Sequence, residues 1–530
     1  MQKQFVIGLD YGTDSVRAVL VDAADGKVAA EKVCEYPRWS RKMYCNISED
    51  EFRHHPLDYL ECLKQVIHGV LDPNPDLAPF VRGIAVDATG STPCLVNRDL
   101  VPLALLPQYA ENPDAMFVLW KDHSAAKESD EITAHADGRL GCVSGQSGPE
   151  FYWPKLLRVL RHSPQLRKDA YSFLDLCTWV SNLLCGNKDP EKVKHAQSVV
   201  AAKFFEDPVS RTLPPLEWFA AIDDCWLDVV SHVHPKGNNG DEAYGTLSEE
   251  FAREFGLNSD VVVSVGMLDG FCGAVGAGIS ESMPVMTLGT SSGYLTVSRD
   301  VADVKGAFAQ GVGQILPGMF SVEMGLSAFG DAYAWLADML GYALEIKGVA
   351  YSKGEILAAL GRDAAQIELS AGLPYATDYF NGRRSPDQNP ALKASIGGLR
   401  LHSSAPEIYR ALVEATCFGT RAIIERMTEY GMKPDKVMCI GGISQKSPFV
   451  MQMMADVTGV TMEVLDNTQA CALGAAMCAA AASGIYGSIY DAQKAMAAGV
   501  KATYFPNPDH KETIDGRYRK YLSMAAQQTF

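Results

Sequence analysis

One pattern occurs twice, far apart in the chain, and it restricts the fold more than any other feature of the sequence. The stretches LDYGTDSVRAVLVD (9–22) and TLGTSSGYLTVSRD (287–300) each contain an apolar strand, a tip centred on Gly-Thr and a returning strand that ends in Asp. An internal repeat of a whole domain core explains this recurrence better than two unrelated hairpins do. The pattern therefore predicts two domains with related cores.

The residues around the repeat predict mixed α/β sheets. Strand patterns over 5–9, 16–21 and 27–36 precede an amphipathic helical pattern over 55–71 and a buried strand that ends at Asp87. The order β-β-β-α-β is typical of an α/β fold with a mixed sheet. A chain of 530 residues is long enough for two such domains. We expect them over 1–265 and 266–530.

Three further patterns complete the predicted organisation. A long amphipathic helix is expected over 406–431, and a strand, a Gly-Gly turn and a helix over 436–459. The Ala- and Gly-rich run at 470–481 predicts a helix that packs very close to a neighbour. Small residues cluster from Gly266 to Gly278, where we expect a hinge between the two halves.

Charge and cysteine content exclude several classes of protein. The formal charge of −17 argues against binding nucleic acid through a broad basic surface, which requires clustered Lys and Arg. The 13 Cys are odd in number and lack a C-x-x-C spacing, so they predict neither a zinc site nor a disulfide framework. The longest apolar run, at 470–487, is too short to span a membrane. We therefore expect a cytoplasmic protein with neither nucleic acid nor membrane as a partner.

The two hairpin tips carry groups that suit phosphate binding. Backbone N–H groups point outward at a tight turn, and Thr or Ser hydroxyls add donors. Asp10 would repel phosphate unless a divalent cation lies between them, and Mg²⁺ fits because it binds carboxylates beside phosphate oxygens while keeping several waters. The turn GGIS (441–444) allows close approach of an adenine ring. The motifs G-x-x-x-x-G-K-[ST] and G-x-G-x-x-G do not occur in the sequence, so the predicted nucleotide site is of another kind.

These pieces have a familiar order. The chain resembles the FGGY carbohydrate kinases of the actin-like ATPase superfamily, and within them it is most similar to the ribulokinase branch. The resemblance is carried by IGLDYGTDSVRAVLVD (7–22), YPRW (36–39), FRHHPLDY (52–59), DATGSTP (87–93), ENPDAMFVLWKDH (111–123), GAVGAG (273–278), SAFGDAYAW (327–335), FNGRRSPDQN (380–389), GGIS and ACALGAA (470–476). It implies an α/β fold of two ribonuclease-H-like, actin-like domains with mixed sheets, flanking a cleft for ATP, Mg²⁺ and a sugar.

The resemblance also implies a role for individual residues. Asp269 is expected to be the general base, which accepts the proton of a sugar hydroxyl as the γ-phosphoryl group arrives. Asp10 is expected to act on Mg²⁺ through water. The nucleotide-binding residues are Asp10, Gly12, Thr13 and Ser15 in the first hairpin, Gly289, Thr290 and Ser291 in the second, and Gly441, Gly442 and Ser444 in the adenosine turn. The sugar-binding residues are Gly90, Ser91, Thr92, Trp120, Lys121, Asp122, Lys203, Asp269 and Glu323.

The implied reaction is ATP-dependent phosphorylation of a ketopentose, with L-ribulose to L-ribulose 5-phosphate as the first choice. Phe271 and Leu326 stand where ribulokinases commonly have His and Gln, so D-ribulose, xylulose, ribitol and a tetrulose stay open as substrates. A motor, chaperone or filament ATPase would share the hairpins and the adenosine turn, but it would lack the segment FVLWKDH and a buried Asp directed at a sugar. A sugar sensor without kinase activity is disfavoured by the presence of Asp10 and Asp269. The oligomeric state, with a homodimer as one option, is left open.

Overall fold

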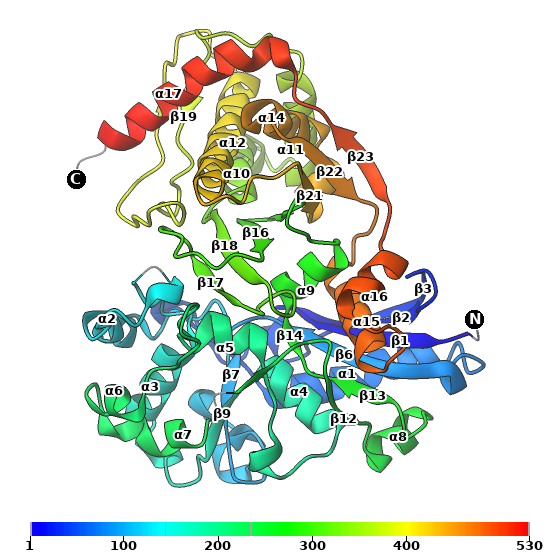
Figure 1. Cartoon of the computed structure of the whole chain (residues 1–530). Helices are drawn as coiled ribbons and strands as arrows, with labels where there is room; N and C mark the ends of the chain where they lie inside the picture. Colours follow the sequence, from blue (N-terminus) through cyan, green and yellow to red (C-terminus); the bar gives the residue numbers. More distant parts are fainter. Residues whose placement is uncertain (1–2, 144, 234–235, 528–530) are drawn as a thin grey trace.

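The computed structural model describes residues 3–143, 145–233 and 236–527, and each of its two lobes is built around a seven-stranded mixed sheet (Figure 1). The first sheet has the order β12-β13-β6-β1-β2-β3, with β14 also paired to β6, and the second has the order β17-β18-β16-β15-β21-β22-β23. The strands of the first sheet are β1 (Phe5–Tyr11), β2 (Ser15–Asp22), β3 (Val28–Glu35), β6 (Val81–Ala88), β12 (Ala243–Thr246), β13 (Val262–Ser264) and β14 (Met267–Leu268). Those of the second are β15 (Val285–Leu288), β16 (Ser292–Ser298), β17 (Ala309–Val312), β18 (Phe320–Leu326), β21 (Lys436–Ile440), β22 (Thr461–Leu465) and β23 (Val500–Tyr504).

The two sheets repeat one topology, which confirms the predicted internal repeat. In the first sheet β1 is antiparallel to β2, β2 is antiparallel to β3, and β6 and β13 follow β1 in parallel. In the second sheet β15 is antiparallel to β16, β16 is antiparallel to β18, and β21 and β22 follow β15 in parallel. An antiparallel edge strand, β12 or β23, completes each series. The hairpins β1–β2 and β15–β16 therefore occupy equivalent places in the two lobes.

Long helices cover the sheets, and most of them coincide with the predicted segments. The helix expected over 55–71 is α1, and the one expected over 406–431 is α12. A capping box formed by Ser404 and Glu407 stabilises the N-terminus of α12. The principal helices are α1 (Pro56–Leu71), α3 (Tyr152–His162), α4 (Leu176–Leu184), α5 (Gln197–Lys203), α9 (Asp269–Gly276), α10 (Gly330–Ile346), α11 (Lys353–Ala364), α12 (Ala405–Glu429), α13 (Gly442–Lys446), α14 (Pro448–Thr458), α15 (Ala470–Ala482), α16 (Ile489–Met496) and α17 (Lys511–Gln527). Within the described residues, the structure offers no helix that combines the length and the apolar character needed to cross a membrane.

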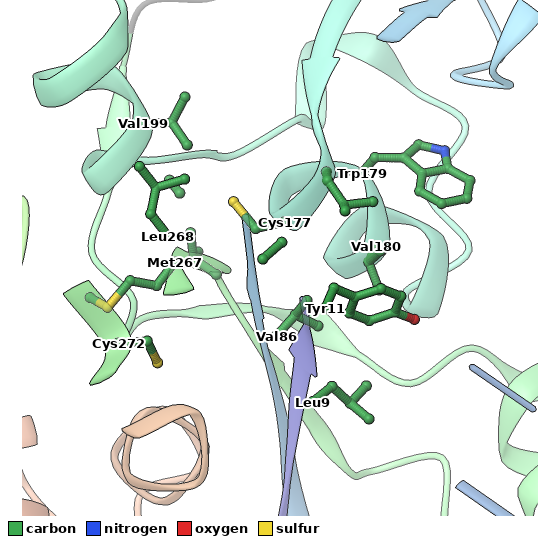
Figure 2. Close-up of a cluster of buried hydrophobic side chains, with 14 of the residues drawn as sticks. Leu9, Tyr11, Val86, Cys177, Trp179, Val180, Val199, Met267, Leu268 and Cys272 are labelled. Carbon is green, nitrogen blue, oxygen red and sulfur yellow. The ribbon is translucent and has the colours of Figure 1, made fainter. Parts of the chain in front are cut away.

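One face of the first sheet is an apolar layer. Figure 2 shows Leu9 and Tyr11 of β1 and Val86 of β6 beside Trp179 and Val180 of α4, and all five are buried. Successive side chains of a strand point to opposite faces of the sheet. Asp10, which follows Leu9 on β1, and Asp87, which follows Val86 on β6, therefore direct their carboxyl groups to the face opposite the apolar layer.

The opposite face is covered by α15, which comes from a distant part of the sequence and lies beside β1 and β6 in the lower lobe of Figure 1. A Cβ on Gly8 would lie 2.0 Å from the carbonyl oxygen of Ala472, and a Cβ on Gly474 would lie 1.9 Å from that of Cys272 in α9. These contacts leave room for glycine alone. The close packing expected of the Ala- and Gly-rich run is confirmed.

The region expected to contain the hinge forms β14 and α9. β14 pairs with β6 of the first sheet, and α9 packs against α15. The division of the chain at 265/266, and the hinge itself, stay predictions.

Candidate active site

The tip of each of the two equivalent hairpins is closed by a hydrogen bond from its glycine N–H to the carbonyl of a following serine. The backbone N–H of Gly12 donates to the carbonyl of Ser15 at 3.0 Å, and the N–H of Gly289 donates to the carbonyl of Ser291 at 3.0 Å. The carbonyl of Thr290, at the second tip, accepts the N–H of Phe329 at 2.7 Å, just before α10 begins. Both predicted phosphate hairpins are therefore tight turns at the ends of strands, with Thr13 and Thr290 at their tips.

Three carboxyl groups meet at one edge of the first sheet. Asp10 lies near the end of β1 with Asp87 beside it on β6, and Asp269 begins α9 directly after β14, the other neighbour of β6. Asp10 forms an ion pair of 3.6 Å with Arg17, its partner across the hairpin. Asp87 is fully buried, and apart from the adjoining carboxyl group of Asp10 neither of its carboxyl oxygens has a hydrogen-bond partner among the described residues. Asp87 is a site residue that the sequence analysis missed, although it ends a buried strand as Asp10 does.

Burial raises the pKa of all three carboxyl groups, and neighbouring carboxylates add to the rise at Asp269 and Asp87. Burial, and then the nearby Asp10 carboxylate, raise the pKa of Asp269 to about 7, although the N–H of Gly270 donates to its Oδ1 at 2.7 Å. Burial also raises the pKa of Asp10, against the opposing effects of Asp87 and Arg17. The pKa of Asp87 is raised well above its usual range by burial and then by the two other carboxylates. A general base with a pKa near 7 is matched to proton transfer near neutral pH.

A pocket of about 350 Å³ opens beside Asp269 and receives residues from both halves of the chain. Lys203, at the end of α5, and Glu323, on β18, line it together with Asp269. Lys203 is buried, and its Nζ lies 4.8 Å from the ring centre of Phe151 and 5.5 Å from that of Phe308. Among the residues expected to bind sugar, those lining the pocket are Gly90, Trp120, Lys121, Lys203, Asp269 and Glu323.

The other three residues expected to bind sugar have structural contacts instead. The buried carboxylate of Asp122 pairs with the buried Arg53. The carbonyl of Ser91 accepts a hydrogen bond of 2.7 Å from Lys155, and the N–H of Thr92 donates to a buried carboxylate. These residues therefore support the wall of the pocket, while Gly90 lies at its surface.

The pocket also contains His123, Glu150, Phe308 and Arg384, which were not assigned from the sequence, and Phe271, which the sequence singled out as a departure from ribulokinases. The guanidinium of Arg384 lies 4.9 Å from the ring centre of Phe308. Arg384 belongs to the motif FNGRRSPDQN, so the signal was present, but the motif alone did not show which of its residues would reach the pocket. Acidic and basic side chains therefore both line this small volume.

A second pocket, of about 770 Å³, begins at the second hairpin. Gly289 and Gly442 both line it, and the remaining walls come mainly from apolar parts of α10, α11, α12 and α14. Gly441 has φ = +96°, and a Cβ there would lie 2.6 Å from the carbonyl oxygen of Leu288, so this turn requires glycine. The buried Ser444 donates to the carbonyl of Gly441 at 2.8 Å and holds the turn closed from within. The pocket has the size and the apolar lining that suit a nucleoside.

The helix α9 runs from the smaller pocket to the strand that precedes the Gly441-Gly442 turn. It begins with Asp269 in the smaller pocket, and a Cβ on Gly273 would lie 3.5 Å from the side chain of Ile440, the residue before the adenosine turn. One helix thus joins Asp269 to the strand end beside the Gly441-Gly442 turn.

The carboxyl groups fit a magnesium ion that is carried by a nucleotide. Hard carboxylate oxygens are suitable Mg²⁺ ligands, and Asp87 supplies buried oxygens without partners beside Asp10. The described residues contain no group of three or more His, Cys, Asp or Glu side chains arranged to hold a metal ion by themselves. Phosphate oxygens and water would therefore complete the coordination.

Known proteins share this architecture along the whole chain. A ribulokinase from Vibrio parahaemolyticus is 37% identical over 98% of this chain and 95% of its own length, and one from Halalkalibacterium halodurans is 31% identical over 99% and 95%. The solved structure of xylulose kinase from Rhodospirillum rubrum matches the fold with a TM-score of 0.82 over 99% of this chain and 98% of that one, at 20% identity. Residues 5–276 match the N-terminal domain of the FGGY family of carbohydrate kinases, and residues 285–483 match its C-terminal domain. The chain is therefore a carbohydrate kinase of the FGGY family, and the two-domain α/β fold and sugar kinase activity expected from the sequence are confirmed.

Proposed function

We propose that this kinase transfers the γ-phosphoryl group of ATP to a hydroxyl of a ketopentose, with L-ribulose as the preferred acceptor and L-ribulose 5-phosphate as the product. The observation that carries the proposal is the position of Asp269 in a sugar-sized pocket, between Lys203 and Glu323 and next to the carboxylate-bearing end of the first hairpin. Two relatives that the chain matches over nearly its whole length are named ribulokinases, which supports L-ribulose as the first choice.

In the proposed reaction Asp269 accepts the proton of the attacking hydroxyl. A sugar hydroxyl is a weak nucleophile, and a carboxylate within hydrogen-bonding reach removes its proton as the new O–P bond forms. Lys203 and Glu323 offer a donor and an acceptor to the remaining hydroxyls and so orient the sugar. The hairpin tips at Thr13 and Thr290 bind phosphate oxygens with backbone N–H and hydroxyl groups. Mg²⁺, held near Asp10, would supply positive charge to the phosphate oxygens of ATP.

The choice of sugar depends on a small part of the pocket. Phe271 lines it with an apolar ring, whereas Leu326, the other residue that departs from ribulokinases, is buried in the core of the second lobe. Of these two departures, Phe271 is the one that would exclude or admit a particular hydroxyl. D-Ribulose, xylulose, ribitol and a tetrulose are the alternative acceptors.

A coupled assay of ADP release tests the proposal. The purified chain is supplied with Mg²⁺, ATP and one sugar at a time from a panel of L-ribulose, D-ribulose, L- and D-xylulose, ribitol and erythrulose. We expect sugar-dependent turnover with the highest kcat/KM for L-ribulose. A preference of about tenfold, or 1.4 kcal/mol, for another sugar would overturn the substrate assignment. ATP hydrolysis that no sugar increases would overturn the proposed transfer reaction.

A further inference from the structure

Trp120 is in contact with both the sugar pocket and the first phosphate hairpin. Its side chain lines the pocket and is 39% exposed, a high value for a large aromatic residue. Its indole Nε1–H donates a hydrogen bond of 2.9 Å to the hydroxyl oxygen of Thr13 at the hairpin tip. One rigid ring therefore joins the place where the acceptor is expected to bind and the place where the phosphate is expected to bind.

The hydrogen bond restricts the direction of the Thr13 hydroxyl proton. A threonine hydroxyl has one O–H donor and two acceptor lone pairs, whereas an indole N–H is a donor only. Because the oxygen of Thr13 accepts from Trp120, its own proton points away from the indole. A phosphate oxygen at the hairpin tip is an acceptor in the remaining directions. The bond thus prepares Thr13 to donate to phosphate.

We propose that Trp120 is a positioning residue that couples sugar binding to phosphate binding: a sugar packed against the ring holds the indole on Thr13, and the indole directs the Thr13 hydroxyl proton toward the phosphoryl group. This inference rests on the proposed function of the two pockets. It predicts that each substrate increases the affinity for the other, by the same factor in both directions.

Asp14, the residue after Thr13 in the hairpin, also accepts a hydrogen bond from an indole N–H, and this second bond serves as a comparison. Trp39 donates its indole N–H to the carboxylate of Asp14 at 2.7 Å, so it makes the same kind of bond one residue further along the tip. A carboxylate has no proton to direct. Trp39 also lies outside the sugar pocket, with the ammonium of Lys121 4.8 Å from its ring centre. Trp39 therefore anchors the hairpin without itself lining the sugar pocket, and it reaches the pocket only through Lys121.

Calorimetric titration of L-ribulose, with and without Mg²⁺ and the β,γ-methylene analogue of ATP, tests the coupling. In the unmodified protein the analogue should tighten sugar binding about 5- to 100-fold, the usual range for coupled sites. Trp120→Phe keeps a ring in the pocket but removes the N–H, and we expect the factor to fall toward one. The matched variant Trp39→Phe should retain it. Thr13→Val should lose the factor as Trp120→Phe does, and the double variant should lose no more than either single one.

Each of three results would overturn the inference. The ATP analogue could still tighten sugar binding in Trp120→Phe, or the two substitutions could reduce this coupling additively in the double variant. The analogue could also leave sugar affinity unchanged in the unmodified protein. A spectroscopic measurement separates its failure from that of the proposed function. The indole N–H signal of Trp120, identified by its loss in Trp120→Phe, should shift when the Mg²⁺–ATP analogue is added without sugar. If no sugar is phosphorylated but this shift occurs, the proposed function fails and the contact between Trp120 and the phosphate hairpin is supported. If L-ribulose is phosphorylated and the signal does not move, the coupling role alone fails.

Discussion

The carboxylate of Asp269 accepts a hydrogen bond of 2.7 Å from the backbone N–H of Gly270, the next residue of the same helix. The bond fixes Oδ1 at the start of α9 and leaves Oδ2 as the oxygen available to the pocket that Asp269 lines. The orientation of the proposed base is thus determined by the helix that it begins, and the chemistry expected of it can be tested directly.

Replacement of Asp269 by Asn should remove the base while keeping the shape of the side chain. We expect kcat to fall by about 10²–10⁴-fold, the usual contribution of a general base. The dissociation constants of sugar and nucleotide, measured separately by calorimetry, should change little. Turnover close to that of the unmodified protein would exclude Asp269 from this role.

The pH dependence of kcat/KM should report the same group. Asp269 must be ionised to accept a proton, and its pKa is about 7. Activity should therefore be highest above pH 7 and should fall as the pH drops below it, approaching a tenfold loss per pH unit. The residual activity of Asp269→Asn should not show this fall in kcat/KM below pH 7. If both proteins show the same fall, the titrating group is a residue other than Asp269.

Replacement of Asp10 by Asn should act on the metal dependence of the reaction. The variant keeps the size of the side chain but loses the charge that faces Arg17 and adjoins Asp87. We expect the Mg²⁺ concentration for half-maximal rate to rise by about tenfold or more, because a carboxylate ligand is lost. Sugar affinity without nucleotide should stay the same. Asp14→Asn, at the exposed tip of the same hairpin, is the control and should leave the Mg²⁺ dependence unchanged.

Phe271 and Leu326 should respond differently to the residues that ribulokinases commonly have there. Phe271 lines the sugar pocket, so Phe271→His should change the ranking of sugars by kcat/KM, in favour of L-ribulose. Leu326 packs against Gly419, where a Cβ would lie 2.9 Å from its side chain. Leu326→Gln buries an amide there and should cost about 1–3 kcal/mol of unfolding free energy without changing the ranking. An unchanged ranking in Phe271→His would remove this residue from specificity.

Two Gly→Ala substitutions in helices should change stability in opposite directions. At Gly474 of α15 the added Cβ would lie 1.9 Å from the carbonyl oxygen of Cys272, so the backbone must move, at a cost of about 1–3 kcal/mol or more. At Gly516, exposed on α17, the nearest atom is 3.8 Å away. Alanine should stabilise that helix by about 0.5–1 kcal/mol, since it loses less conformational entropy than glycine. Chemical denaturation of both variants measures the difference, and equal effects would contradict the close packing of α15.

Much of the fold could be predicted because it depends on local patterns. The two Gly-Thr hairpins, the helix α1 and the glycines of the adenosine turn were found from strand periodicity, apolar spacing and turn chemistry. The site was predicted in part, since Asp269, Lys203 and Glu323 share one pocket. Asp87 and Arg384 were missed, because their roles depend on which strands pair and how a loop folds. Asp122 was placed in the sugar site from its motif, but its partner Arg53 lies in another segment, and no local pattern reveals such a pairing.

The packing of α15 on the first sheet determines when the N-terminal lobe can complete its folding during synthesis. The face of β1 and β6 that carries Gly8 and Gly83 is complementary to a helix encoded some 400 residues later. During synthesis this face of the sheet stays exposed until residues 470–482, which form α15, have left the ribosome. The core of the N-terminal half is therefore incomplete without α15. A truncated chain that ends near the middle would leave the face with Gly8 and Gly83 uncovered and prone to aggregation. The last part of the chain to be made completes the first part.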